Sequence, residues 1–186
     1  MRYSVLKTSN QEPLDIEYVK AHLNALPNDS DEDDLIIEPL ITSAREYCEN
    51  ITGRAFIPQT IRAYPDVSEQ VILLPRPPIT KIDSITLYHD DNTSETLSAD
   101  SDYSCDPDNG LLVFHVNLSG LRDFNPIAVE YEAGYAKLPQ LLQEAMRLLI
   151  GHWYANRESV QTGSTTAVEL PQTTLAILRQ YKQRWC

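Results

Sequence analysis

The densest group of potential metal ligands lies at residues 29–34, where five of the six residues are acidic. A calcium-binding loop between two helices needs oxygen ligands at alternate positions, a glycine at the sixth position and a glutamate at the twelfth. Counted from Asp29, those two places hold Asp34 and Leu40, so the calcium pattern fails. We interpret the run as a solvated acidic face that complements the positive end of a helix dipole. This candidate acidic face consists of Asp29, Asp31, Glu32, Asp33 and Asp34.

Histidine and cysteine, the other common metal ligands and catalytic groups, are scattered along the chain. No GxSxG, HExxH, Walker loop, GxGxxG or CxxC motif occurs in the sequence. Cys105 could act as a nucleophile with a distant histidine, because such pairs meet in space rather than in sequence. Nothing else in the sequence supports that role. We therefore predict no catalytic residue, no metal site and no cofactor, and we predict that the protein is not an enzyme.

Cysteine usage and hydropathy indicate the compartment. Cys48, Cys105 and Cys186 are an odd number with no paired spacing, which favours reduced thiols and synthesis in the cytoplasm. The first residues contain no apolar core of a signal peptide, and no apolar run is long enough to cross a bilayer. We expect no membrane partner.

The formal net charge of −12 is unevenly distributed. Residues 1–50 carry −7 and residues 51–136 carry −8, whereas residues 137–186 carry +3. A chain with this charge lacks the basic stripe that holds phosphates by counterion release. It should repel DNA.

A central helix is predicted for residues 139–160, because apolar side chains cover most of its circumference at a 3.6-residue period. Such a helix must be covered on several sides and therefore belongs to a core. We interpret Gly151 as a tolerated glycine in preference to a close approach by a second helix. Stacking between copies would account for the large apolar residues of this helix. The candidate residues for packing between subunits are Gly151, Trp153 and Tyr154.

Two helices should precede the β-type region. Asp15 can cap the first, which carries apolar residues at heptad-like spacing and ends before Pro27. The second follows the acidic run and ends before Gly53, a residue suited to a helix C-terminus. Pro39 disturbs the pattern, so we expect either a kink there or a late start of the helix.

Residues 54–136 show short β-type runs separated by turns. Turns are expected at residues 90–92 and 106–110, and a bulge is expected near Ile82 and Ile85, which are out of phase. Residues 75–78, Pro-Arg-Pro-Pro, should form a stiff extended connector. The predicted strands are Gln59–Tyr64, Val71–Leu74, Lys81–Tyr88, Glu95–Leu97, Tyr103–Asp106, Leu111–Val116 and Ile127–Glu132.

A last helix should begin at Pro171, after a Thr/Ser/Gly-rich stretch. Its apolar stripe is Leu170, Thr174, Ile177, Leu178, Tyr181 and Trp185, and its basic residues are Arg179, Lys182 and Arg184. We predict an α+β fold in which a small bundle of about four helices is interrupted by an inserted antiparallel β module. The expected parts are an N-terminal helical part (1–53), the β module (54–136) and a C-terminal helical part (137–186).

Several stretches, in their order and spacing, together resemble the head–tail connector (adaptor) proteins of long-tailed bacteriophages, in the longer variety with a β insert. The resemblance covers nearly the whole chain. The matching residues are Leu14–Leu26, Ala44–Tyr47, Thr52–Arg54, Leu74–Pro78, Val129–Tyr135, Gly151–Tyr154, Asn156–Glu158 and Glu169–Pro171.

The resemblance implies a structural protein of the virion neck, made in the host cytoplasm. Such proteins form a ring, usually a dodecamer, on the portal protein, and the ring extends the DNA channel and supports head-completion or tail proteins. Double-stranded DNA would pass through without specific binding, so the acidic face could line the channel or lie on the outer surface.

The resemblance also suggests that the last helix docks on the portal, whereas an amphipathic helix usually packs on its own bundle. Two other functions stay open. One is a neck or tail-junction binding module that forms no ring on the portal. The other is an enzyme with an unrecognised site.

Overall fold

The computed structural model describes residues 1–23, 31–65, 69–156 and 171–183. The chain divides into two compact units. The β unit comprises residues 1–10, 53–136 and 183–186, and the helical unit comprises residues 11–52 and 137–182. The β unit therefore includes the first ten residues, which the sequence-based division had placed with the N-terminal helices.

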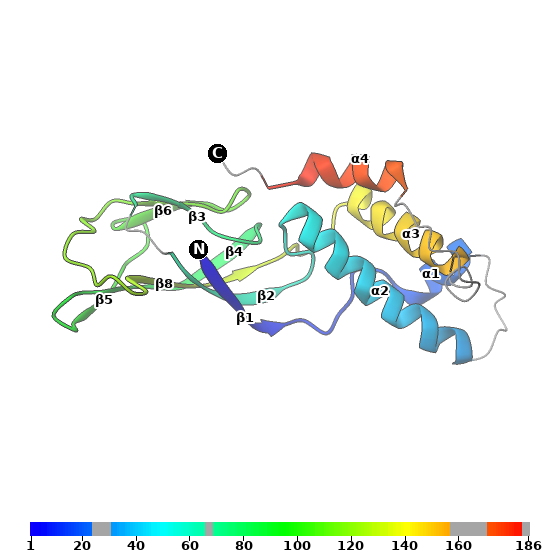
Figure 1. Ribbon diagram of the computed structural model, residues 1–186, viewed down its shortest axis with the longest axis horizontal. Coiled ribbons are helices and arrows are strands. Elements are labelled where there is room, and N and C mark those ends of the chain that lie inside the picture. Colours follow the sequence, from blue (N-terminus) through cyan, green and yellow to red (C-terminus); the bar gives the residue numbers. More distant parts are fainter. Residues whose placement is uncertain (24–30, 66–68, 157–170, 184–186) are drawn as a thin grey trace. The chain divides into compact units, whose positions relative to one another are not determined.

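The β unit contains two antiparallel sheets (Figure 1). The five-stranded sheet has the order β1-β2-β8-β4-β5, and the three-stranded sheet has the order β3-β7-β6. The strands are β1 (Arg2–Thr8), β2 (Gln59–Tyr64), β3 (Val71–Leu73), β4 (Ile79–Tyr88), β5 (Ser94–Thr96), β6 (Tyr103–Asp106), β7 (Leu111–Phe114) and β8 (Ile127–Ala133).

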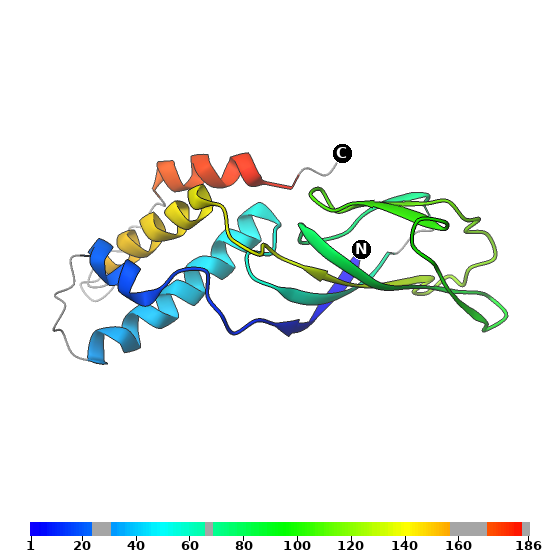
Figure 2. The same ribbon diagram turned by 180° about the vertical axis from the view of Figure 1, so that it is seen from behind.

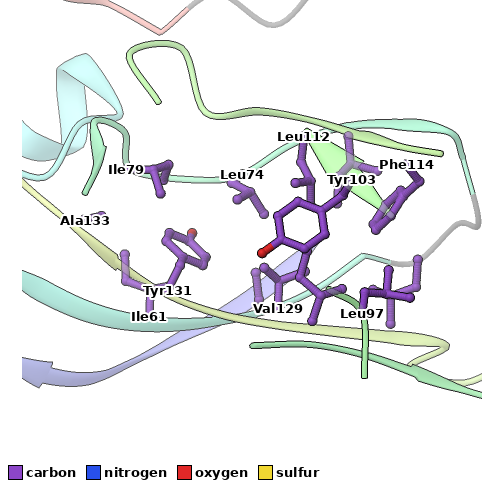
Figure 3. Packing of buried hydrophobic residues seen from close by; sticks show 14 of the residues in the cluster. Ile61, Leu74, Ile79, Leu97, Tyr103, Leu112, Phe114, Val129, Tyr131 and Ala133 are labelled. Atoms are coloured by element: carbon purple, nitrogen blue, oxygen red, sulfur yellow. The ribbon is translucent and has the colours of Figure 1, made fainter. Parts of the chain in front are cut away.

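One hydrophobic core lies between the two sheets, as Figure 3 shows for its labelled side chains. Alternation along each strand builds this core, because successive side chains point to opposite faces of a sheet. In β8, Ile127, Val129 and Tyr131 are fully buried, whereas Glu130 between them is only half-buried. Leu112 and Phe114 of β7 reach the same core from the other sheet.

The predicted α+β fold with an antiparallel β insert is confirmed, and all seven predicted strands are present within a few residues of their expected bounds. The pairing of β4 with β8 shifts register between Ile82 and Ser84, at the predicted bulge. Asn92 and Gly110 adopt positive φ in the two predicted turns.

Two expectations for the β unit were wrong. Residues 75–78 are not a simple extended connector, since Arg76 has a φ of 57° in the left-handed region and the Pro77–Pro78 peptide bond is cis. Strand β1 was not predicted at all. All seven of its residues are exposed, and only Tyr3 and Val5 alternate with polar residues, a pattern too short to predict a half-buried strand.

The helical unit contains α1 (Ile16–Leu23), α2 (Asp31–Thr52), α3 (Gln140–Ala155) and α4 (Gln172–Tyr181), which Figure 2 shows from the opposite side. The predicted cap is present, because a carboxylate oxygen of Asp15 accepts a 2.9 Å hydrogen bond from the amide of Glu17. The core positions of α2 follow the helical repeat and are Ile37, Ile41, Ala44 and Cys48.

Helix α2 begins at Asp31, eight residues before Pro39, so a late start of this helix is wrong. Proline has no amide hydrogen and leaves the carbonyl of Leu35 without its helical donor. Both Pro39 and Leu35 lie on the exposed side of α2, where water can supply that donor. The helix therefore tolerates the proline.

Candidate assembly surfaces

The apolar stripe of α4 packs inside the helical unit. Thr174 and Leu178 are fully buried, Ile177 is nearly so, and α4 contacts both α2 and α3. Arg179 of α4 and Lys182, which directly follows the helix, are basic and exposed. The stripe therefore serves the bundle of its own chain, and docking on the portal through this helix stays a prediction. Leu170, Arg184 and Trp185, which complete the predicted docking helix, lie outside the described residues.

Gly151 of α3 marks a close approach by α1. A Cβ atom built on Gly151 would lie 3.2 Å from Nε2 of His22 and 3.9 Å from a methyl carbon of Leu23. This contact corrects the interpretation of Gly151 as a merely tolerated glycine. The absence of a side chain there lets α1 lie against α3 in the same unit.

Trp153 and Tyr154, the other two candidates for packing between subunits, are half-buried. The ring of Trp153 meets that of Tyr47 in α2 edge to face, with 5.8 Å between the ring centroids. Gly151 contacts α1 and Trp153 contacts α2, and both contacts lie within one chain. Their role between subunits stays a prediction.

The acidic face begins at the first turn of α2, which contains Asp31, Glu32 and Asp33. The carboxylate of Asp34 forms an ion pair with the ammonium group of Lys20 in α1. The hydrogen bond from Lys20 to Asp34 raises the pKa of the lysine. Asp34 therefore joins α1 to α2. Asp29 lies outside the described residues.

A second set of charges is buried between α2 and the segment before α1. Nε of Arg45 lies 2.8 Å from a carboxylate oxygen of Glu12, and Nη1 lies 3.0 Å from one of Glu49. Arg45 and Glu49 are 6% and 2% exposed. These ions satisfy one another inside the helical unit, so they are structural.

Sequence reasoning missed a surface on β1, which we call the β1 surface: Arg2, Tyr3, Val5, Leu6 and Lys7. The side chains of Tyr3, Val5 and Leu6 are 43%, 40% and 48% exposed. The guanidinium group of Arg2 lies 4.8 Å above the ring of Phe124, and Nε of Arg76 donates a 3.1 Å hydrogen bond to the hydroxyl of Tyr3. The alternation of Tyr3 and Val5 with polar residues was the only signal for this strand.

The two cysteines in the described part of the chain are poor nucleophiles. Burial, aided by the negative charge of Asp106, raises the pKa of the Cys105 thiol to about 11. Burial and the nearby Glu49 raise the pKa of Cys48 to about 12. A thiol with such a pKa is protonated at neutral pH, and only the thiolate attacks.

Within the described ranges, no three His, Cys, Asp or Glu side chains are placed to hold a metal ion. None of the helices described is both long enough and apolar enough to span a membrane.

Three solved structures share this fold over 100% of the chain and 97% of theirs, each at 16% sequence identity. One is from the neck of an empty gene transfer agent (GTA) particle computed with C6 symmetry, with a TM-score of 0.75. Another is from the neck of a native GTA particle computed with C12 symmetry, with a TM-score of 0.72. The third is from the virion of a native GTA particle, with a TM-score of 0.69.

A search of curated proteins finds no match. A family model described as "Head completion protein" matches residues 13–184, which include the whole β insert and all four helices. The match covers far more than half of the sequence, so the chain belongs to the head completion protein family.

Proposed function

We propose that this protein is a structural head–tail connector of the virion neck that forms a ring on the portal vertex. The family match over residues 13–184 carries the proposal. The fold shared with proteins from GTA necks, in particles treated with C6 and C12 symmetry, supports a ring and favours a dodecamer. The ring extends the DNA channel and supports head-completion or tail proteins.

The charge of the chain suits passage of DNA. A ring of copies that each carry a formal charge of −12 surrounds the duplex with like charge, which disfavours retention of phosphates. The isolated protein should therefore not retard duplex DNA at physiological salt. A salt-sensitive shift at micromolar protein would contradict this part of the proposal.

A non-enzymatic role agrees with the chemistry of the described residues. The thiol of Cys105, the one nucleophile that the sequence suggested, has a pKa of about 11 because of its burial. The buried ions around Arg45 pair with one another inside the bundle.

Docking on the portal is assigned to the exposed side of α4. Arg179 on that side and Lys182 just after the helix are exposed, while Thr174 and Leu178 hold the helix on its own bundle. Arginine is enriched in interface centres, and its planar group pairs well with carboxylates. The portal should therefore present acidic side chains to this face.

The test is to mix the purified protein with portal rings from the same virus, and to examine the mixture by sedimentation and negative-stain microscopy. A second ring stacked on the portal, with the symmetry of a dodecamer, is expected. A protein that stays monomeric at high concentration and with portal present would refute ring formation. Such a result would favour a neck or tail-junction binding module instead.

A further inference from the structure

The β1 surface is an unusual edge for a sheet. Strand β1 is the first in the order of its sheet and pairs only with β2 among the strands described. Tyr3, Val5 and Leu6 expose between 40% and 48% of their surface, although large apolar side chains on an edge strand favour association. The strand does carry two protective features, Lys7 and a register shift between Val5 and Lys7. These features limit unspecific pairing but leave the apolar side chains accessible.

The charge of the β1 surface is opposite to that of most of the chain. Arg2 and Lys7 are both exposed, and residues 1–10 contain no acidic side chain. Arg76 adds a third positive charge beside Tyr3. Tyrosine and arginine are among the residues most enriched in the energetic centres of interfaces. A basic, partly apolar strand in an acidic protein is suited to an acidic protein partner.

The other edge of the same sheet has the complementary charge. Strand β5 ends the strand order, and the hairpin that joins it to β4, residues 86–96, contains three acidic residues and no lysine or arginine. Asp90, Asp91 and Glu95 are all exposed. The hydroxyl and amide of Thr93 donate hydrogen bonds to Asp91 and lower its pKa, so this carboxylate stays ionised.

We infer that, in the assembled ring, the β1 surface of one copy binds the acidic β4–β5 hairpin of the next copy. This inference rests on the proposed ring. A ring with more than two copies uses head-to-tail contacts, in which two different surfaces of the chain meet. The sheet offers such a pair, because its two edges are distinct and opposite in charge. The same contact repeated around the ring covers the apolar side chains of β1 on every copy.

The inference is tested with charge reversal on full-length protein. Variant A is Arg2→Glu with Lys7→Glu, and variant B is Asp90→Lys with Glu95→Lys. Alone, each variant places like charges at every contact between copies. The dissociation constant of self-association should therefore rise at least about tenfold. In an equal mixture, alternating copies of A and B restore opposite charges at every contact. A chain that carries all four substitutions also restores them.

Two control variants match these changes in net charge at exposed residues away from both edges. Glu69→Lys with Asp108→Lys matches variant B, and Lys81→Glu with Lys137→Glu matches variant A. Self-association is measured by sedimentation velocity over a range of concentrations, and circular dichroism checks the fold. If variant A or B unfolds, the single substitutions Lys7→Glu and Glu95→Lys replace them in the same design.

The inference is supported if A and B each associate weakly, the mixture recovers, and the controls behave as the unsubstituted protein does. It is overturned, with ring formation intact, if A and B associate normally, or if their mixture fails to recover. If the unsubstituted protein associates neither at any attainable concentration nor on portal rings, ring formation itself fails, and the inference fails with it.

Discussion

The hydroxyl of Tyr131 in β8 donates a 2.7 Å hydrogen bond to the carbonyl oxygen of Pro75, in the turn between β3 and β4. Tyr131 is fully buried, and burial raises the pKa of its hydroxyl, which is therefore a protonated donor at physiological pH. Strand β8 belongs to the five-stranded sheet, and the turn follows a strand of the three-stranded sheet. The bond links β8 of one sheet to the turn that leads out of the other, beside the hydrophobic core that packs between the two sheets.

Replacing Tyr131 with Phe should destabilise the protein by about 1–3 kcal/mol, because the buried carbonyl of Pro75 loses its donor while the ring still fills the core. Urea unfolding measures the change. The Tyr18→Phe variant is a matched control, since Tyr18 is 48% exposed and its hydroxyl is not in a core. Equal stability of the two variants would show that the bond contributes nothing.

The buried ions of the helical unit should depend on one another. Glu49→Ala removes one partner of Arg45, which is only 6% exposed. This change should lower the free energy of unfolding by about 3–5 kcal/mol. Arg45→Met with Glu49→Leu removes both charges and should cost less than Glu49→Ala alone. As a control, Glu46→Ala should cost below about 0.5 kcal/mol, because Glu46 is 63% exposed and lies 3.7 Å from Arg45. A double variant that is less stable than Glu49→Ala would contradict this account.

Gly151 and His22 should be coupled in stability. Alanine is better than glycine in a helix by about 1 kcal/mol, but its Cβ would lie 3.2 Å from Nε2 of His22. In the natural protein, Gly151→Ala should therefore raise the free energy of unfolding little or not at all. In a His22→Ala background it should raise that free energy by about 0.5–1 kcal/mol. Thermal unfolding of the four proteins in this cycle gives the coupling. Equal effects in both backgrounds would mean that α1 does not constrain position 151.

His22 should also make stability depend on pH. Burial, and then the positive charge of Arg147, lower the pKa of His22 in the folded protein. In the range between this pKa and the unfolded value of about 6.5, the unfolded chain binds more protons, so stability falls as pH falls. His22→Gln should flatten that part of the curve. Unfolding curves at several pH values give the dependence of stability on pH. The variant His115→Gln, at an exposed histidine, is the control. If His22→Gln leaves the pH dependence of stability unchanged, the effect is refuted.

The two sides of α4 should separate folding from docking. Leu178→Ala removes a fully buried side chain and should cost about 2–5 kcal/mol. Arg179→Glu with Lys182→Glu changes only exposed groups, so the melting temperature should stay nearly the same while binding to the portal is lost. Calorimetry and co-sedimentation with portal rings measure the two effects. Undiminished portal binding by the charge-reversed variant would exclude docking through this face.

The sequence by itself determined the elements whose side chains follow a regular period. All seven predicted strands are present. Each of them except β5, whose three residues are exposed, buries apolar side chains in the core, and the sequence pattern indicates that burial. The cap at Asp15 and the glycine after α2 could also be predicted from the sequence, because helix termini depend on hydrogen bonds and backbone angles of neighbouring residues. The likeness to phage connectors depended on the order of these local features.

Only the tertiary structure decided which surfaces meet. Strand β1 exists because residues 2–8 pair with β2, more than fifty residues away. The short alternation of Tyr3 and Val5 with polar residues does not identify that partner. The partner of the α4 stripe and the approach of His22 to Gly151 were likewise undecided, since an amphipathic face or a glycine fits several neighbours equally well. The periodicity of apolar residues indicates whether a side chain is buried. Only the folded chain determines which other residues bury it.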